Sequence, residues 1–296
     1  MTRPLGLLAA AVASVVTVGL LAGCTADTDD GTAPSTSASA APSSDGSADA
    51  SSSDDARTTE RVAAPPAPRP KACYRLTFEQ LTVPSNDSEP VPCTRRHDAQ
   101  TIHVGRLDTV VDGHSLAVDS ERVRRQLART CPRKLAEQVG GTPETRNLSR
   151  FEVVWFSPTL EQADRGADWF RCDLVAIAAG DVLFPLPPRP RVAGVLDRPG
   201  ALATYGLCGT AEPGTPTFER VICARRHSWR AISTIALPGG KRYPGTARVR
   251  SVGDSPCRDT ARDQAADPLQ FEYGWEWPSR KQWANGQRFG YCWAPD

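Results

Sequence analysis

Two basic turns contain the residue types that bind anions. Tandem arginines followed by a histidine occur twice, each time two residues after a cysteine: Arg95, Arg96 and His97 after Cys93, and Arg225, Arg226 and His227 after Cys223. The planar guanidinium fork suits phosphate and carboxylate groups. One hypothesis is therefore a pair of anion-binding corners. The alternative, which we favour for the histidines, is an imidazole that hydrogen-bonds the backbone of its own turn beside a disulfide.

Tryptophan could form a second kind of binding surface, since its ring combines a large apolar body with a polar edge. Trp155 and Trp275 occupy equivalent positions in two predicted strands, so we expect both in the core. Trp283 and Trp293 have no aromatic counterpart in the first half of the chain. We therefore expect these two residues to be the better candidates for an exposed patch that binds carbohydrate or peptide.

The sequence contains no recognisable catalytic motif. The patterns Gly-x-Ser-x-Gly, His-Glu-x2-His and Ser-x2-Lys are all absent. The chain has four histidines, so a Ser-His-Asp group assembled from distant residues stays open. The prediction is a protein that is not an enzyme, with no catalytic residue, no metal and no cofactor.

The chain has nine cysteines, and one of them lies in a distinctive N-terminal context. Arg3 precedes an uncharged, apolar or small-residue stretch that ends in Leu-Ala-Gly before Cys24. This pattern is typical of a lipoprotein signal peptide over residues 1–23, with a lipid attached to Cys24. An uncleaved transmembrane anchor is the alternative, because the stretch is nearly long enough to span a membrane. We expect a protein anchored by lipid to the outer face of the cytoplasmic membrane.

Residues 24–70 are rich in Ser, Thr, Ala and Pro and have almost no large apolar side chain. Such a segment buries too little surface to offset its ordering entropy, so it predicts a disordered tether. The following residues are mildly basic within a chain whose net charge is +1. No basic block with interleaved aromatic residues occurs, which argues against a nucleic acid partner.

The remaining sequence repeats once. Residues 91–97 match residues 221–227, and residues 151–172 match 271–292 without gaps at Phe, Trp, Pro, Gln, Gly and Cys positions. The repeat predicts a first copy over residues 71–183, a Pro-rich linker over 184–204 and a second copy over 205–296. In the linker, residues 184–190 are expected to form an extended spacer.

Eight cysteines remain once Cys24 is set aside, and an exported chain meets oxidising conditions. Their closest spacing is 15 residues, which favours disulfides over a zinc site. Four cysteines per copy allow three connectivities. Because the cysteine pattern repeats with the copies, we expect pairing within each copy, and we favour neighbours: Cys73–Cys93, Cys131–Cys172, Cys208–Cys223 and Cys257–Cys292.

Hydrophobic patterns predict an α+β fold in each copy. A helix is expected from a cap at Asp119 or Ser120, bearing apolar residues from Val123 to Val139. Pro132 should kink or break it, and Gly140 with Gly141 should end it. Strands are expected at residues 76–83, 101–105, 151–156, 170–177 and 231–235.

Four sequence features recur in both copies: the starting cysteine, the Cys-x3-His element, the Trp-x2-Pro element and the final Gly-x5-Cys element. In these features the chain resembles the septum-formation domain family of actinobacterial envelope proteins. The family typically has Cys-x-x-Pro-His followed by an acidic residue. This chain has Arg-Arg-His instead, followed by Asp98 in the first copy and Ser228 in the second. The resemblance implies a part in cell division or envelope assembly and no particular reaction.

Together these features predict a non-enzymatic, lipid-anchored envelope protein that binds or scaffolds, with a role linked to septum formation. Its expected partners are the membrane, through the lipid, and an envelope protein or cell-wall polymer. One alternative is a lipoprotein that captures a glycan or an anionic envelope polymer on its Trp and Arg surfaces. A second alternative is an envelope hydrolase, which would need a cleft where a histidine meets a carboxylate or a serine.

Overall fold

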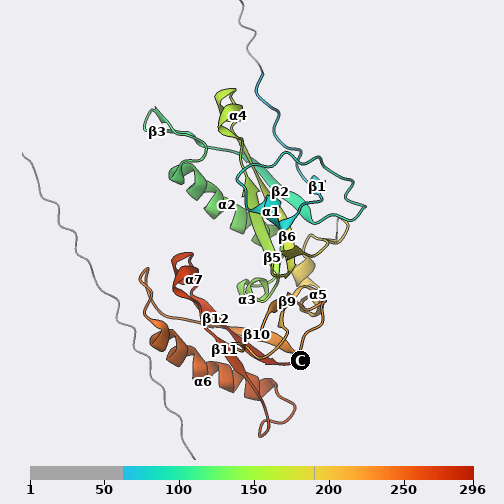
Figure 1. The fold of residues 1–296 in the computed structure, drawn as a ribbon, viewed down its shortest axis with the longest axis vertical. Coiled ribbons are helices and arrows are strands. Elements are labelled where there is room, and N and C mark those ends of the chain that lie inside the picture. The colour runs from blue at the N-terminus through green and yellow to red at the C-terminus, as the bar shows by residue number, and fades with distance from the viewer. Residues whose placement is uncertain (1–62, 190) are drawn as a thin grey trace, which may run out of the picture. The chain divides into compact units, whose positions relative to one another are not determined.

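The computed structural model describes residues 63–189 and 191–296 (Figure 1). The predicted signal peptide, the lipid-bearing Cys24 and most of the predicted tether lie outside the described residues. Within these two ranges, no helix is both long enough and apolar enough to cross a membrane.

The first half of the described chain is built around strand β6, which pairs antiparallel with β2 on one side and with β5 on the other. Helix α2 lies alongside this sheet and contacts all three strands (Figure 1). The elements are β1 (Cys73–Tyr74), α1 (Phe78–Leu81), β2 (Ala99–Arg106), β3 (Val110–Val111), β4 (His114–Ser115), α2 (Glu121–Val139), α3 (Pro143–Asn147), β5 (Phe151–Phe156), α4 (Leu160–Asp164), β6 (Trp169–Ala179) and β7 (Val182–Leu183).

The second half has a similar order, with β12 between β10 and β11 and helix α6 packed against them (Figure 1). Strands β8 and β9 pair with each other, and β9 joins β6 of the first half at Ala179 and Val221. The elements are a 3₁₀ helix η1 (Val195–Asp197), α5 (Ala201–Tyr205), β8 (Leu207–Gly209), β9 (Arg220–Ile222), β10 (Trp229–Ala236), α6 (Thr246–Gln264), β11 (Gly274–Glu276), α7 (Arg280–Ala284) and β12 (Phe289–Pro295).

The predicted α+β class is confirmed, and so are four of the five predicted strands. The strand predicted over residues 76–83 is wrong, because residues 78–81 form helix α1. The local reason is a capping box: the Thr77 side chain accepts from the Gln80 N–H, and the Gln80 side chain accepts from the Thr77 N–H. These two bonds favour a helical turn over the extended conformation that the apolar residues suggested.

Helix α2 begins and ends where the sequence predicts, with the Ser120 hydroxyl as its N-cap and Gly140 at a φ of 74° as its C-cap. The predicted break at Pro132 is wrong, since the helix continues through this residue. Pro132 and Ala128, whose carbonyl loses its intrahelical N–H donor, are both exposed. Water can therefore satisfy that carbonyl, which removes part of the usual penalty for proline inside a helix.

The segment predicted as an extended spacer is packed against the rest of the fold. The Leu186 N–H donates to the His97 carbonyl at 2.9 Å, and Leu186 is buried. Further along the predicted linker, Val192, Val195 and Leu196 are also buried. They share one apolar cluster with residues from both halves, including Val139, Leu174 and Ile222. The linker thus contributes core surface as well as connecting the two halves.

All four expected disulfides are present with the predicted neighbour pairing. Cys131–Cys172 fastens α2 to β6, and Cys257–Cys292 fastens α6 to β12. The other two each tie a short strand to a basic turn. In the chain-entropy description, loops of this size each contribute about 3–4 kcal/mol by restricting the unfolded chain.

Trp275 on β11 is buried between two glycines that leave room for its indole. A Cβ atom added at Gly253 of α6 would lie 1.9 Å from Trp275 Cζ2, and one added at Gly290 of β12 would lie 2.3 Å from Cη2. Both distances are far below van der Waals contact. The helix and the closing strand can therefore hold this indole only while both positions lack a side chain.

Gly253→Ala is expected to lower the free energy of unfolding by about 1–3 kcal/mol, the usual cost of overpacking a core. Alanine in a helix interior normally gains about 1 kcal/mol over glycine, so a net loss would identify the clash with Trp275 as the dominant effect. Urea unfolding followed by tryptophan fluorescence measures this. Gly240→Ala is the control, because nothing lies within 4 Å of its added Cβ. Unchanged stability in Gly253→Ala would contradict this packing.

Candidate functional site

The first basic turn is held by backbone, disulfide and imidazole together. The Arg95 N–H donates to the Pro92 carbonyl at 2.9 Å, and the adjacent Cys93 is bonded to Cys73 on β1. His97 Nδ1 donates to the Arg95 carbonyl at 2.8 Å, and His97 is fully buried. The His97 Nε2 atom is buried and has no hydrogen-bond partner among the residues that the structure describes. This imidazole therefore fixes the turn from beneath.

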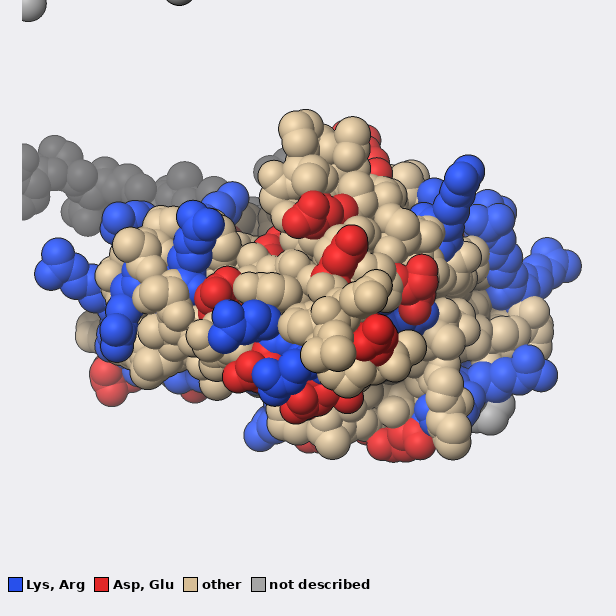
Figure 2. Space-filling model, turned by 90° about the horizontal axis from the view of Figure 1, so that it is seen from below, with Lys and Arg blue, Asp and Glu red and all other residues tan. Residues whose placement is uncertain are grey.

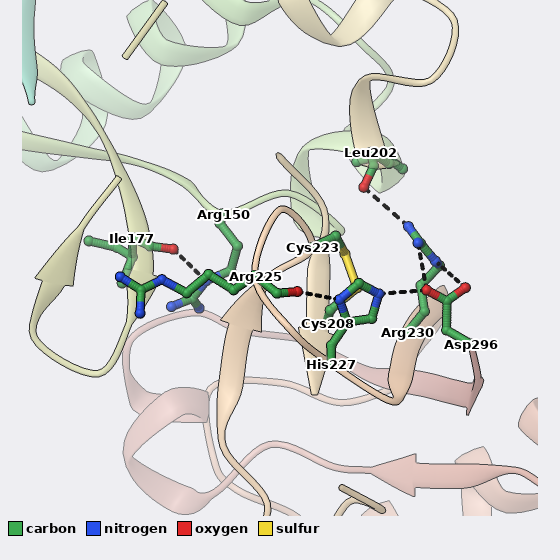
Figure 3. Close-up of a disulfide and its surroundings, with 9 residues drawn as sticks. All are labelled: Arg150, Ile177, Leu202, Cys208, Cys223, Arg225, His227, Arg230 and Asp296. Atoms are coloured by element: carbon green, nitrogen blue, oxygen red, sulfur yellow. Dashed lines mark hydrogen bonds and ion pairs between the residues drawn. A yellow bond between two sulfur atoms is a disulfide. The ribbon is translucent and has the colours of Figure 1, made fainter. Parts of the chain in front are cut away.

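The second basic turn has the same backbone arrangement and one additional acidic partner (Figure 3). The Arg225 N–H donates to the Ile222 carbonyl at 2.8 Å, and His227 Nδ1 lies 2.6 Å from the Arg225 carbonyl. His227 Nε2 lies 2.6 Å from Asp296 Oδ2. Since a carbonyl and a carboxylate can only accept, the imidazolium form of His227 satisfies both contacts.

Asp296 also receives two hydrogen bonds from the Arg230 guanidinium, at 3.0 and 2.7 Å. This fork, more than the contact with His227, holds the pKa of the Asp296 carboxyl down at about 2. Arg230 donates in addition to the Leu202 carbonyl on α5 at 3.2 Å (Figure 3). The group thus ties the turn, the end of β12 and α5 together.

The four arginines of the two turns point into solvent. Arg95, Arg96, Arg225 and Arg226 are all exposed, and none forms an ion pair with any residue that the structure describes. The histidines take the structural role that the alternative interpretation gave them, since both hydrogen-bond the turn backbone beside a disulfide. The turns therefore present four unpaired guanidinium groups on rigid supports.

One group near the second turn has the residue types of a metal site. Ligand atoms of Cys208, His227 and Asp296 all lie within 4.8 Å of one another. The Cys208 sulfur is bonded to Cys223, so it is not a thiolate that could bind a metal (Figure 3). His227 and Asp296 already contact each other. The geometry is therefore that of a structural cluster.

A family profile described as septum formation matches residues 117–292. The chain belongs to the septum formation family. The match covers more than half of the chain, from just before α2 to Cys292 in β12. It confirms the resemblance to this family and connects the protein with septum formation, as one match that does not itself show a second tandem copy. No curated protein and no solved structure matches this chain.

This member of the septum formation family contains a buried charged pair that sequence reasoning missed. Arg171 and Asp173 lie on β6 with exposures of 2% and 0%, and Arg171 Nε is 3.1 Å from Asp173 Oδ2. Thr101 donates to the other carboxylate oxygen at 2.7 Å. Burial raises the pKa of Asp173 to about 6, against the opposing effects of Arg171 and Thr101. An Arg and an Asp two residues apart in a mostly apolar predicted strand were the available signal.

The Arg171 guanidinium lies between two aromatic rings, 4.2 Å from the Tyr74 centroid and 4.7 Å from the Phe156 centroid. Its Nη2 donates to Asn86 at 2.8 Å. A cavity of about 1000 Å³ is lined by Arg171, Trp169 and Pro65–Pro68 among others. Asp173 and the two rings thus hold a guanidinium that reaches the wall of this cavity.

The prediction that Trp283 and Trp293 form an exposed patch is wrong, because both side chains are fully buried. Trp283 Nε1 donates to the Gly240 carbonyl at 3.1 Å, and Trp293 Nε1 donates to Glu276 at 3.2 Å. Trp293 directly follows the disulfide cysteine Cys292, and Asp173 directly follows the disulfide cysteine Cys172, so one strand buries an aromatic ring after its cysteine and the other a charge. Trp275 is buried as expected, and Trp155 is partly buried against the core.

The charged side chains on one face of the molecule lie in separate groups. Figure 2 shows one face, on which Lys and Arg side chains form several separate groups with acidic side chains among them. This face therefore offers discrete basic positions, with no continuous basic surface across it.

Asp296→Asn should lower stability at neutral pH by roughly 1–2 kcal/mol, after allowance for screening of this partly exposed group. The folded-state pKa of Asp296 is depressed, so its stabilisation is present above the unfolded pKa near 3.8 and is lost as pH falls towards 2. Urea unfolding between pH 6 and pH 2 should show the wild-type advantage disappearing over that window. Asp181→Asn, at an exposed position without an ion pair among the described residues, is the control. Parallel pH profiles of wild type and Asp296→Asn would contradict this assignment.

Proposed function

We propose that this protein is a non-enzymatic, lipid-anchored binding protein of the cell envelope. In this proposal it presents two copies of one α+β unit to an anionic envelope component during septum formation. The observation that carries the proposal is the pair of exposed Arg-Arg turns, one in each half. Membership of the septum formation family supports a role related to septum formation.

The idea of two copies is supported by equivalent local features. Each half has a disulfide from its first strand to its basic turn and another from its long helix to its closing strand. The pairing of β2 with β6 shifts register between Thr101 and His103, and the pairing of β10 with β12 shifts between Ala231 and Ser233. A bulge at the same sequence position is a specific feature that unrelated sheets do not share as a rule.

Binding through the arginines is supported by their rigidity and by their lack of partners. An arginine on a fixed turn loses less conformational entropy on binding than one on a mobile loop. Planar guanidinium groups also form paired hydrogen bonds with phosphate and carboxylate oxygens. Other surface arginines, such as Arg125 and Arg165, already pair with a glutamate on the same helix. The turn arginines remain available.

A hydrolytic role at these turns finds little support in the histidines. Both ring nitrogens of His227 are engaged, and His97 is buried with its free nitrogen closed off from solvent. Neither imidazole is placed to take a proton from a bound water or hydroxyl. A binding role therefore accounts for the geometry better than turnover does.

The anchor is part of the same proposal. The Leu-Ala-Gly-Cys sequence supports lipid attachment at Cys24 and a position on the outer face of the cytoplasmic membrane. A coil of the length of residues 24–70 has an end-to-end distance of about 35–40 Å. Such a tether would let the basic turns reach wall polymers or envelope proteins near the membrane.

Cys24→Ser is expected to move the protein from the membrane fraction to the soluble fraction. One acyl chain binds a membrane only marginally, so the wild type should carry two or three. Cell fractionation and the mass of the mature protein measure both points. A Cys24→Ser protein that stays in the membrane, together with a wild type that carries no acyl mass, would refute the lipid anchor and favour a transmembrane one.

Two double variants test the basic turns: Arg95→Ala with Arg96→Ala, and Arg225→Ala with Arg226→Ala. Each should weaken binding of the soluble chain to polyphosphate by roughly 5–30-fold at low salt, because two charge-assisted contacts are lost. Stability should stay within about 0.5 kcal/mol of the wild type. Binding is measured by retention on immobilised polyphosphate at increasing salt.

The matched control is Arg122→Ala with Arg124→Ala, which removes the same charge from exposed positions on α2. Binding to polyphosphate should change much less in this control than in the turn variants. An equal loss would show that net charge alone governs binding, and the proposed role of the turns would then fail.

A further inference from the structure

We propose that a cleft in the second half binds an oligosaccharide of uncharged pyranose rings, such as a wall glycan strand. The cleft has a volume of about 500 Å³ and lies between the loop after β8, helix α6 and strand β11. It is separate from the basic turns, so this proposal goes beyond the anionic partner discussed above.

Aromatic rings form one wall of the cleft. Tyr273 directly precedes β11 and Trp277 directly follows it, and both pack against the cluster that contains the buried Trp275. Tyr273 and Trp277 are only partly buried. Four residue steps separate their Cα atoms by at most about 14 Å. Two rings at this separation can each contact a different unit of an extended chain.

The floor of the cleft is rigid. The Trp275 indole is fixed between Gly253 and Gly290, and a Cβ added at Gly274 would lie 2.9 Å from the Pro213 ring. The loop after β8 therefore lies directly against β11. Among the described strands, β11 pairs with β12 alone. The contacts of β11 with β12, α6 and the loop after β8 preorganise the cleft, which lowers the entropy lost when a ligand binds.

Polar groups at the cleft suit hydroxyl groups. Asp254 and the exposed Glu212 supply carboxylate acceptors, and Arg250 supplies donors. The Tyr273 hydroxyl lies 3.5 Å from Asp254 Oδ1, at the limit of hydrogen bonding, so Asp254 retains acceptor capacity. Glu276 is already committed, because it pairs with Arg220 at 2.7 Å and accepts from Trp293.

The charges select among ligand classes. Two uncommitted carboxylates against one arginine disfavour an anionic polymer by like-charge repulsion. A cationic amine drawn to Trp277 would be repelled by the Arg250 guanidinium, which lies 5.4 Å from that ring centroid, whereas a neutral ring would not. A neutral ring with several hydroxyl groups can use the aromatic faces and both kinds of hydrogen-bonding group without a charge conflict.

The fold does not require these side chains. Under the proposed correspondence of the two halves, the positions of Asp254, Tyr273 and Trp277 are Ala128, Val153 and Ser157 in the first half. Helix α2 and strand β5 form there without any of these aromatic or acidic groups. Their presence in the second half is therefore better explained by a ligand than by folding.

The test is titration calorimetry of the soluble, disulfide-bonded chain with the β-1,4-linked tetramer of N-acetylglucosamine. The wild type should bind it saturably. Trp277→Ala should weaken binding at least about tenfold, because a central aromatic contact is lost. Asp254→Asn should weaken binding roughly 3–10-fold without altering packing, since it exchanges an acceptor for an amide of the same shape.

Asp263→Asn, at an exposed position on α6 outside the cleft, should bind the tetramer like the wild type. The double variant Arg225→Ala with Arg226→Ala should also retain this binding, which separates the cleft from the basic turns. Near-ultraviolet circular dichroism checks that each variant is folded. Failure of the wild type to bind the tetramer, undiminished binding by folded Trp277→Ala and Asp254→Asn, or polyphosphate binding that depends on Asp254 would overturn the proposal.

Discussion

The disulfide between each long helix and the central strand of its half is the constraint on which the other features depend. Cys131–Cys172 and Cys257–Cys292 hold α2 and α6 against their sheets from fully buried positions. Each helix is rich in charged residues and buries only a narrow set of side chains, so packing alone gives it limited hold. Each disulfide fixes its helix against the sheet. In the second half, the fixed helix α6 leaves space for the Trp275 indole and for the cleft beside it.

The central strands β6 and β12 bury different residue types on either side of their disulfide cysteines. In the first half, β6 buries Arg171 with Asp173, and their charges are compensated by each other, by Thr101 and by two aromatic rings. In the second half, Tyr291 and Trp293 flank Cys292 on β12. A buried ion pair is costly to desolvate and gains little stability over apolar packing, so stability alone does not account for the Arg171–Asp173 pair.

Sequence patterns predicted the parts of the fold that depend on local chemistry. Cysteine order predicted the four pairings. Apolar segments, alternating with polar residues at β2 and β10, predicted β2, β5, β6 and β10, and a cap at Asp119 or Ser120 predicted the start of α2. The wrong predictions concern residues whose environment depends on contacts with distant parts of the chain. Exposure of Pro132 makes this residue tolerable inside a helix. Trp283 and Trp293 are buried by residues that are distant in the sequence, so the sequence did not predict their burial. The cleft was invisible for the same reason, because Asp254 and Trp277 meet only after α6 packs on β11.

The shared core around the linker has a consequence for how the molecule unfolds. Val192, Val195 and Leu196 pack with Val139 and Leu174 from one half and Ile222 from the other, and β6 and β9 are joined as neighbouring strands. Separating the halves would expose this apolar surface on both sides. The described region should thus melt as a single cooperative block, even though its chain reads as two similar segments.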